Sequence, residues 1–112
     1  MKYKVSSQEE AKSIALSTID ELGISEAFAL GEAGRFKGGV NGAIMAESIN
    51  RLAEMEAKAT TPQEKVNLAL QSAELITRFD EISRTKGQDI SYINYFYKKS
   101  PLGVEMAENA RK

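Results

Sequence analysis

The strongest candidate for binding chemistry is the glycine-rich run GEAGRFKGGVNG at residues 31–42, which holds five of the chain's eight glycines. Arg35, Phe36 and Lys37 lie in its middle, so two cations flank an aromatic ring. Backbone N–H groups outside regular structure, together with cations, can hold an anion. Ordering glycine costs more conformational entropy than ordering any other residue. The run is therefore expected to be a packing corner, a flexible connection or a binding site.

The run does not match the sequences that usually bind phosphates. A P-loop follows a strand and ends in Gly-Lys-Ser/Thr, a dinucleotide fingerprint reads G-x-G-x-x-G, and neither pattern occurs here. Residues 31–34 have the GxxG form that some RNA-binding domains use, but those domains need a sheet and none is predicted. The first interpretation of the run is a plain flexible or packing loop, and the alternatives are contact with a macromolecular partner and a site for a small anion or nucleotide. The predicted partner-binding residues are Arg35, Phe36, Lys37, Gly38 and Gly39.

A second candidate lies at residues 92–99, because half of the chain's aromatic residues fall between residues 92 and 97. Helical spacing cannot turn them all towards one core, so at least one tyrosine is expected at the surface beside two lysines. Such a surface suits a protein interface and also single-stranded nucleic acid. The first interpretation, ahead of both kinds of interface, is a helix that only closes the core with its hydroxyls reaching solvent. The predicted contact residues are Tyr92, Tyr95, Lys98 and Lys99.

Composition argues against catalysis. The chain has no histidine and no cysteine, which removes the commonest general base, the thiol nucleophile and the usual zinc ligands. The carboxylates show no spacing typical of a catalytic pair or a metal centre, and Glu74 with Arg78 is a solvated i,i+4 helix pair. We expect no enzyme activity, no catalytic residue, no metal and no cofactor.

Charge and hydropathy narrow the class of protein further. The net charge is −1, whereas a strong nonspecific nucleic-acid binder is usually basic. No apolar run approaches the ~18 residues of a membrane span, and no secretory signal is recognised. We expect a cytoplasmic protein that does not associate with a membrane. The chain is expected to form a single helical domain over residues 1–112, with residues 1–6 as an extended arm.

Helical periodicity outside the glycine run predicts an all-α fold, a compact bundle of five to six helices with a Gly-rich loop between the second and third. The first, third and fourth helices form the bundle, and the aromatic helix covers one side. Asn41 is expected to cap the third helix. The expected helices span residues 8–22, 26–30, 42–58, 62–86, 90–99 and 102–110.

The helix expected at residues 62–86 has the clearest start, because Thr61, Pro62 and Glu64 form a capping box with proline at the first helical position. It carries two apolar stripes, which predicts cover on more than one side. We interpret it as the central helix, or as a helix that also meets a second copy in a homodimer. The first stripe is Val66, Ala69, Ala73 and Ile76, and the second is Leu68, Leu75, Phe79 and Ile82.

These patterns favour binding over catalysis. We predict a non-enzymatic helical protein that binds and modulates another macromolecule, most readily a protein. Its expected role is that of a regulator, an adaptor or a phage- or plasmid-encoded inhibitor of a host protein complex. The alternative is a nucleic-acid-binding protein that uses Arg35, Lys37 and the Tyr/Lys cluster at 92–99.

Overall fold

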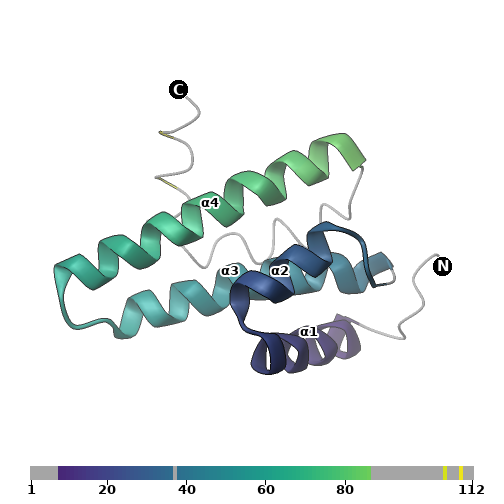
Figure 1. Ribbon diagram of the computed structural model, residues 1–112, viewed down its shortest axis with the longest axis horizontal. Coiled ribbons are helices and arrows are strands. Elements are labelled where there is room, and N and C mark those ends of the chain that lie inside the picture. The colour runs from purple at the N-terminus through teal and green to yellow at the C-terminus, as the bar shows by residue number, and fades with distance from the viewer. Residues whose placement is uncertain (1–7, 37, 87–104, 106–108, 110–112) are drawn as a thin grey trace.

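The computed structural model describes residues 8–36, 38–86, 105 and 109. Four helices make up this part of the chain (Figure 1): α1 (Gln8–Leu22), α2 (Ile24–Glu32), α3 (Gly38–Lys58) and α4 (Pro62–Lys86). No strand occurs among these residues, so the all-α prediction is confirmed.

The number of helices differs from the five to six expected. The described residues contain four. The helices expected at 90–99 and 102–110 and the arm at 1–6 lie outside the described residues, apart from residues 105 and 109, which are both helical.

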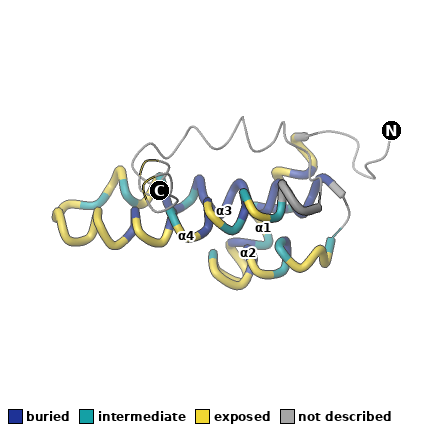
Figure 2. The backbone as a smooth tube through the Cα atoms, turned by 90° about the horizontal axis from the view of Figure 1, so that it is seen from above, coloured by how far each residue is buried: buried dark blue, intermediate teal, exposed yellow. Residues whose placement is uncertain are grey.

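α3 is the central helix. α1, α2 and α4 each pack extensively against it, whereas α4 meets α2 only marginally. Every residue from Gly39 to Asn50 is buried, a stretch rich in glycine and alanine (Figure 2). Small side chains let neighbouring backbones approach α3 from several directions. The expectation that residues 62–86 form the central helix is therefore wrong, because α1 and α2 pack against α3 rather than against α4.

The glycine run is largely helical rather than a loop. Gly31 belongs to α2, while Gly38, Gly39 and Gly42 lie in the first turns of α3. α2 thus ends at Glu32, and α3 begins at Gly38 rather than at Gly42.

Gly31 marks the point where α2 and α3 cross. A Cβ atom added there would lie 3.0 Å from the backbone oxygen of Asn41 and 3.3 Å from the side chain of Ile44. The absence of a side chain therefore sets how closely the two helices pack. The packing that this close approach allows compensates for the low helix propensity of glycine.

Gly34 ends α2 in a Schellman motif. Its φ of 74° lies in the left-handed region, which glycine enters at little cost. The Gly34 N–H donates to the oxygen of Gly31 at 3.0 Å, and the Arg35 N–H donates to the oxygen of Leu30 at 3.1 Å. These two bonds are the pair that defines the motif.

Asn41 fixes the connection between α2 and α3 from inside α3. Its Oδ1 accepts a hydrogen bond from the Phe36 N–H at 2.9 Å, and its Nδ2 donates to the Phe36 oxygen at 2.7 Å. The amide thus satisfies both backbone groups of Phe36, whose ring packs against the core. The predicted role of Asn41 as the cap of a helix starting at residue 42 is wrong, because the helix begins three residues before it.

Local sequence signals set the ends of α1 and α4 as predicted. Gly23 ends α1 with a φ of 93°, and its N–H donates to the Ile19 oxygen at 2.7 Å. At the start of α4, the Thr61 hydroxyl accepts a hydrogen bond from the Glu64 N–H at 3.1 Å. α2 begins without such help, because no side chain caps its first turn.

Replacing Thr61 with Ala is expected to lower the free energy of unfolding by about 1 kcal/mol, because the Glu64 N–H loses its side-chain acceptor. Thr60 precedes it and is equally exposed, so Thr60→Ala is the matched control and should change stability by less than ~0.5 kcal/mol. Urea denaturation measures both values. Equal losses for the two variants would show that the hydroxyl does not cap α4.

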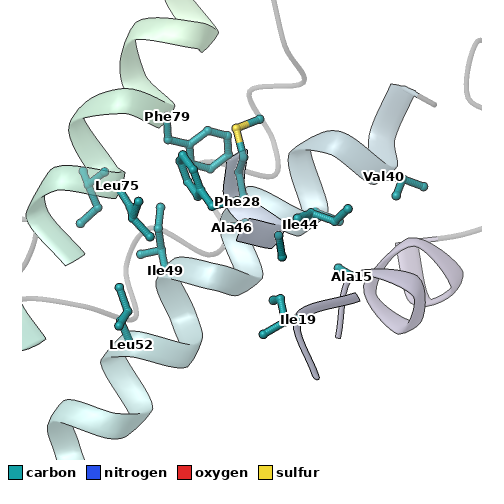
Figure 3. Close-up of a cluster of buried hydrophobic side chains, with 14 of the residues drawn as sticks. Ala15, Ile19, Phe28, Val40, Ile44, Ala46, Ile49, Leu52, Leu75 and Phe79 are labelled. Atoms are coloured by element: carbon teal, nitrogen blue, oxygen red, sulfur yellow. The ribbon is translucent and has the colours of Figure 1, made fainter. Parts of the chain in front are cut away.

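Side chains from all four helices form one core around α3 (Figure 3). Leu68, Leu75 and Phe79 of α4 belong to it, with exposed fractions of 9%, 7% and 1%. These residues belong to the second apolar stripe, through which a homodimer is predicted, and this stripe is largely covered within one chain. A homodimer stays a prediction from the sequence.

Candidate functional site

The residues predicted to bind a partner do not form one exposed tip in the described part of the chain. Arg35 is exposed, Phe36 is half-buried against the core, and Gly39 is buried in α3, which also contains Gly38. The remaining predicted contacts fall outside the described residues; these are Lys37, Tyr92, Tyr95, Lys98 and Lys99.

A different surface is open between α3 and α4. These helices have 21 and 25 residues, whereas α2 has only 9. The hairpin of α3 and α4 thus extends well past α2, and its far end is mostly exposed (Figures 1 and 2). A cavity of about 420 Å³ lies there, and we call it the hairpin groove. It is lined by Met55, Lys58, Ala59, Glu64, Asn67, Leu68 and Gln71.

The hairpin groove has an apolar floor and a polar rim. Among its apolar lining residues, Leu68 is buried, Ala59 is half-buried and Met55 is 43% exposed. Asn67 and Gln71 stand along the α4 side, four residues apart and therefore on one face of the helix. This combination of an apolar base with a few placed polar groups is typical of binding sites, and the volume falls in their ~300–1,000 Å³ range.

A smaller cavity of about 90 Å³ continues the hairpin groove towards the first residue of α2. Gln71 lines both cavities, which makes them neighbours along α4. Ile24 from α2 and Leu52 from α3 also line the smaller one. The N-terminus of α2 therefore closes the groove at this end.

Arg78 holds α2 against α4 at the closed end. Its guanidinium donates two hydrogen bonds to the Glu32 carboxylate, at 2.6 Å and 3.1 Å, and it also lies 4.9 Å from the centre of the Phe28 ring. The hydrogen bonds to Glu32 raise the pKa of Arg78 despite opposing desolvation. Glu74, the partner predicted from spacing, is a weaker contact at 3.6 Å.

A polar cavity of about 230 Å³ lies between α1 and α3. Glu47 and Asn50 in its wall are buried, and Arg51 at its rim pairs with Asp20 of α1 at 3.2 Å. Two cations and two carboxylates line it, so their charges largely compensate one another. Its lining residues are Lys12, Leu16, Glu47, Asn50, Arg51 and Glu54.

Within the described part of the chain, no group of three or more acidic side chains is placed to hold a metal ion. No helix there is both long and apolar enough to cross a membrane. Comparison of the chain with protein-family models, curated proteins and solved structures found no match. The hairpin groove therefore has to be interpreted from its own geometry.

The hairpin groove was not predicted from the sequence. Met55 and Leu68 both occupy apolar positions at helical spacing. This pattern predicts burial for every such position alike. The signal that could have pointed to the groove is the difference in length between the second predicted helix and its two longer neighbours, since a short helix cannot cover the whole of a long hairpin.

Proposed function

We propose that this protein is a non-catalytic binding protein that docks on another protein through the hairpin groove and modulates it. The observation that carries this proposal is the open groove beyond α2, which is lined by Met55, 43% exposed, and by the buried Leu68. Methionine suits such a position because its flexible thioether adapts to different partner surfaces.

Further apolar surface surrounds the same end of the hairpin. Val66 and Leu70 are 44% and 54% exposed on α4, and their spacing of four residues places them on one face. They lie on the flank of α4 away from the hairpin groove, since neither lines it. Protein interfaces combine such apolar centres with a polar rim, so this end of the molecule is the best supported docking surface.

The surroundings of the groove favour a protein over nucleic acid. One cation, Lys58, and one carboxylate, Glu64, line the groove, so it offers no net positive charge to a phosphate backbone. Arg51 and Arg78 both pair with carboxylates of this chain. Nucleic-acid binding stays a prediction that depends on Arg35 and on residues 92–99 outside the described part. The roles of regulator, adaptor or phage-encoded inhibitor and the cytoplasmic setting also stay predictions from the sequence.

Met55→Glu is expected to weaken binding of a protein partner by at least about tenfold, since a charge in a desolvated hot spot costs more than ~1.4 kcal/mol. The partner is first captured from a cell lysate with the full chain and identified by mass spectrometry, and its affinity for each variant is then measured by calorimetry. Leu22→Glu is the matched control, because Leu22 is a similarly exposed apolar residue of α1 that does not line the groove. Equal affinities for both variants, with both folded by circular dichroism, would exclude the groove as the docking site.

A further inference from the structure

Asn41 is followed directly by Gly42, and no other asparagine in the chain precedes a glycine. Glycine has no Cβ atom to hinder its backbone nitrogen from approaching the preceding side chain, so an asparagine at such a position readily loses its amide. We propose that Asn41 is a site of spontaneous deamidation, that the corner between α2 and α3 protects it in the folded protein, and that deamidation prevents the corner from forming again. The corner consists of Gly31, Phe36 and Asn41 with the backbone around them.

The reaction needs only water as a co-reactant. The backbone nitrogen of Gly42 attacks the Cγ atom of Asn41 and forms a bond to it. The Cγ–Nδ2 bond breaks, and ammonia leaves with the proton of the Gly42 N–H, so that a five-membered succinimide ring remains. Water then opens the ring. If the bond from the nitrogen to Cγ breaks, residue 41 becomes aspartate, and if the bond to the backbone carbonyl carbon breaks, it becomes isoaspartate.

Three features of the corner oppose this reaction. A helix tilts each side chain towards its N-terminus, so the Asn41 Cγ points away from the Gly42 nitrogen, whose N–H is used within α3. Phe36 also holds the amide, since Oδ1 accepts from its N–H at 2.9 Å and Nδ2 donates to its oxygen at 2.7 Å. Asn41 is only 6% exposed, which limits the access of water. The ring can therefore form only after the start of α3 unwinds and releases Phe36.

The start of α3 is the part of the corner that can open without the rest of the fold. Gly38, Gly39 and Gly42 lie there, and glycine is among the poorest helix formers. Packing of the neighbouring helices, rather than local preference, keeps this segment helical. Local opening of such a segment costs less free energy than global unfolding. We therefore expect the reaction to proceed from a state in which α4 remains folded.

Neither product can restore the corner. Aspartate still accepts from the Phe36 N–H, but a second carboxylate oxygen replaces the Nδ2 that donates to the Phe36 oxygen at 2.7 Å. Two acceptors then face each other, and an unpaired charge lies at a buried position, which is costly. Isoaspartate adds one atom to the backbone of α3 and disrupts its i→i−4 hydrogen bonds. Deamidation thus removes the contacts that prevented it.

Mass spectrometry of the digested full chain measures the rate of deamidation at each asparagine. In concentrated urea, Asn41 is expected to react at least about tenfold faster than Asn67, which precedes Leu68, and Gly42→Ala should abolish this difference. Equal rates at Asn41 and Asn67 in urea would remove Asn41 as a reactive site. In native buffer, the rate at Asn41 should fall at least about a hundredfold, because local opening populates the reactive state ~1% of the time or less. An Asn41 that reacts as fast in native buffer as in urea would overturn the protection by the corner.

Two variants distinguish local opening from global unfolding. Phe36→Ala removes a ring that packs against the core beside the corner and should raise the native rate at Asn41 about tenfold. Thr61→Ala weakens the start of α4 instead and should change that rate by less than about twofold. Equal acceleration by both variants would mean that Asn41 reacts only from the globally unfolded chain, which overturns protection by the corner.

Asn41→Asp reproduces one product directly. It should unfold at a lower urea concentration than the original chain, or fail to fold. Asn67→Asp makes the same change at an exposed position of α4 and should unfold at nearly the original urea concentration. An unchanged midpoint for Asn41→Asp would overturn the claim that the corner cannot form again. None of these measurements involves the hairpin groove, so this inference and the proposed function stand or fail separately.

Discussion

Replacing Phe28 with Ala is expected to lower the free energy of unfolding by about 3–5 kcal/mol, the usual cost of removing a buried aromatic ring. Phe28 is fully buried and points from α2 towards Phe79 and Leu75 of α4 (Figure 3). Its ring also lies under the guanidinium of Arg78. A domain is typically stable by only ~5–15 kcal/mol, so this single side chain accounts for a large share of the total.

Urea denaturation followed by circular dichroism measures the loss at Phe28. Phe36→Ala provides the matched comparison, because Phe36 is only half-buried against the same core. It should cost clearly less than Phe28→Ala, yet it should still destabilise the protein, which an exposed loop residue would not do. If the two variants lose equal stability, α2 is not held to the core mainly through Phe28.

Replacing Gly31 with Leu is expected to cost about 3 kcal/mol or more, because it forces extra atoms into a packed crossing. The first added atom alone would lie 3.0 Å from the backbone oxygen of Asn41. That oxygen belongs to a helix and cannot turn aside as a flexible side chain could. α2 and α3 must therefore separate, which also strains the hydrogen bonds between Asn41 and Phe36.

Two further variants isolate the effect of the crossing. Gly31→Ala should be less harmful than Gly31→Leu, because the gain in helix propensity, up to ~1 kcal/mol, offsets part of the overpacking. Ala29→Leu adds a larger side chain at an exposed position of the same helix and should change stability by no more than ~0.5 kcal/mol. A neutral Gly31→Leu in thermal and urea unfolding would mean that α2 and α3 can separate freely.

The elements that were predicted correctly are those whose ends are set by neighbouring residues. α1 spans Gln8–Leu22 and α4 spans Pro62–Lys86, as expected. Gly23 ends the first of these helices and Thr61 caps the second, each through contacts within a few residues. Such contacts are visible in the sequence because they do not depend on the rest of the fold.

The start of α3 could not be predicted in this way. Gly38, Gly39 and Gly42 each disfavour a helix on local grounds, so the run was interpreted as a loop. Packing of α1, α2 and α4 around the same residues outweighs that preference. The same packing places α3 at the centre of the fold. The number of apolar residues along α4 does not reveal which helix is central.

The hairpin groove was missed for a related reason. The apolar pattern of α4 shows which of its side chains should be buried, but it does not show which helix will bury them. Leu68 and Leu75 are buried within the chain, whereas Val66 and Leu70 stay exposed. Which flank is left open depends on the length and placement of α2, and these are properties of the tertiary structure.

The two hydrogen bonds between Asn41 and Phe36 also bear on the order in which the parts of the chain fold. Its partners are five residues apart, and Gly31 meets Ile44 nearby in sequence, whereas Arg78 must find Glu32 across 46 residues. Closing short loops costs little entropy, so the corner between α2 and α3 should form early, and the contact of α4 with α2 through Arg78 and Glu32 should form later. We expect Asn41→Ala to slow folding and Arg78→Ala mainly to speed unfolding. Stopped-flow kinetics showing the reverse would place the docking of α4 before the corner.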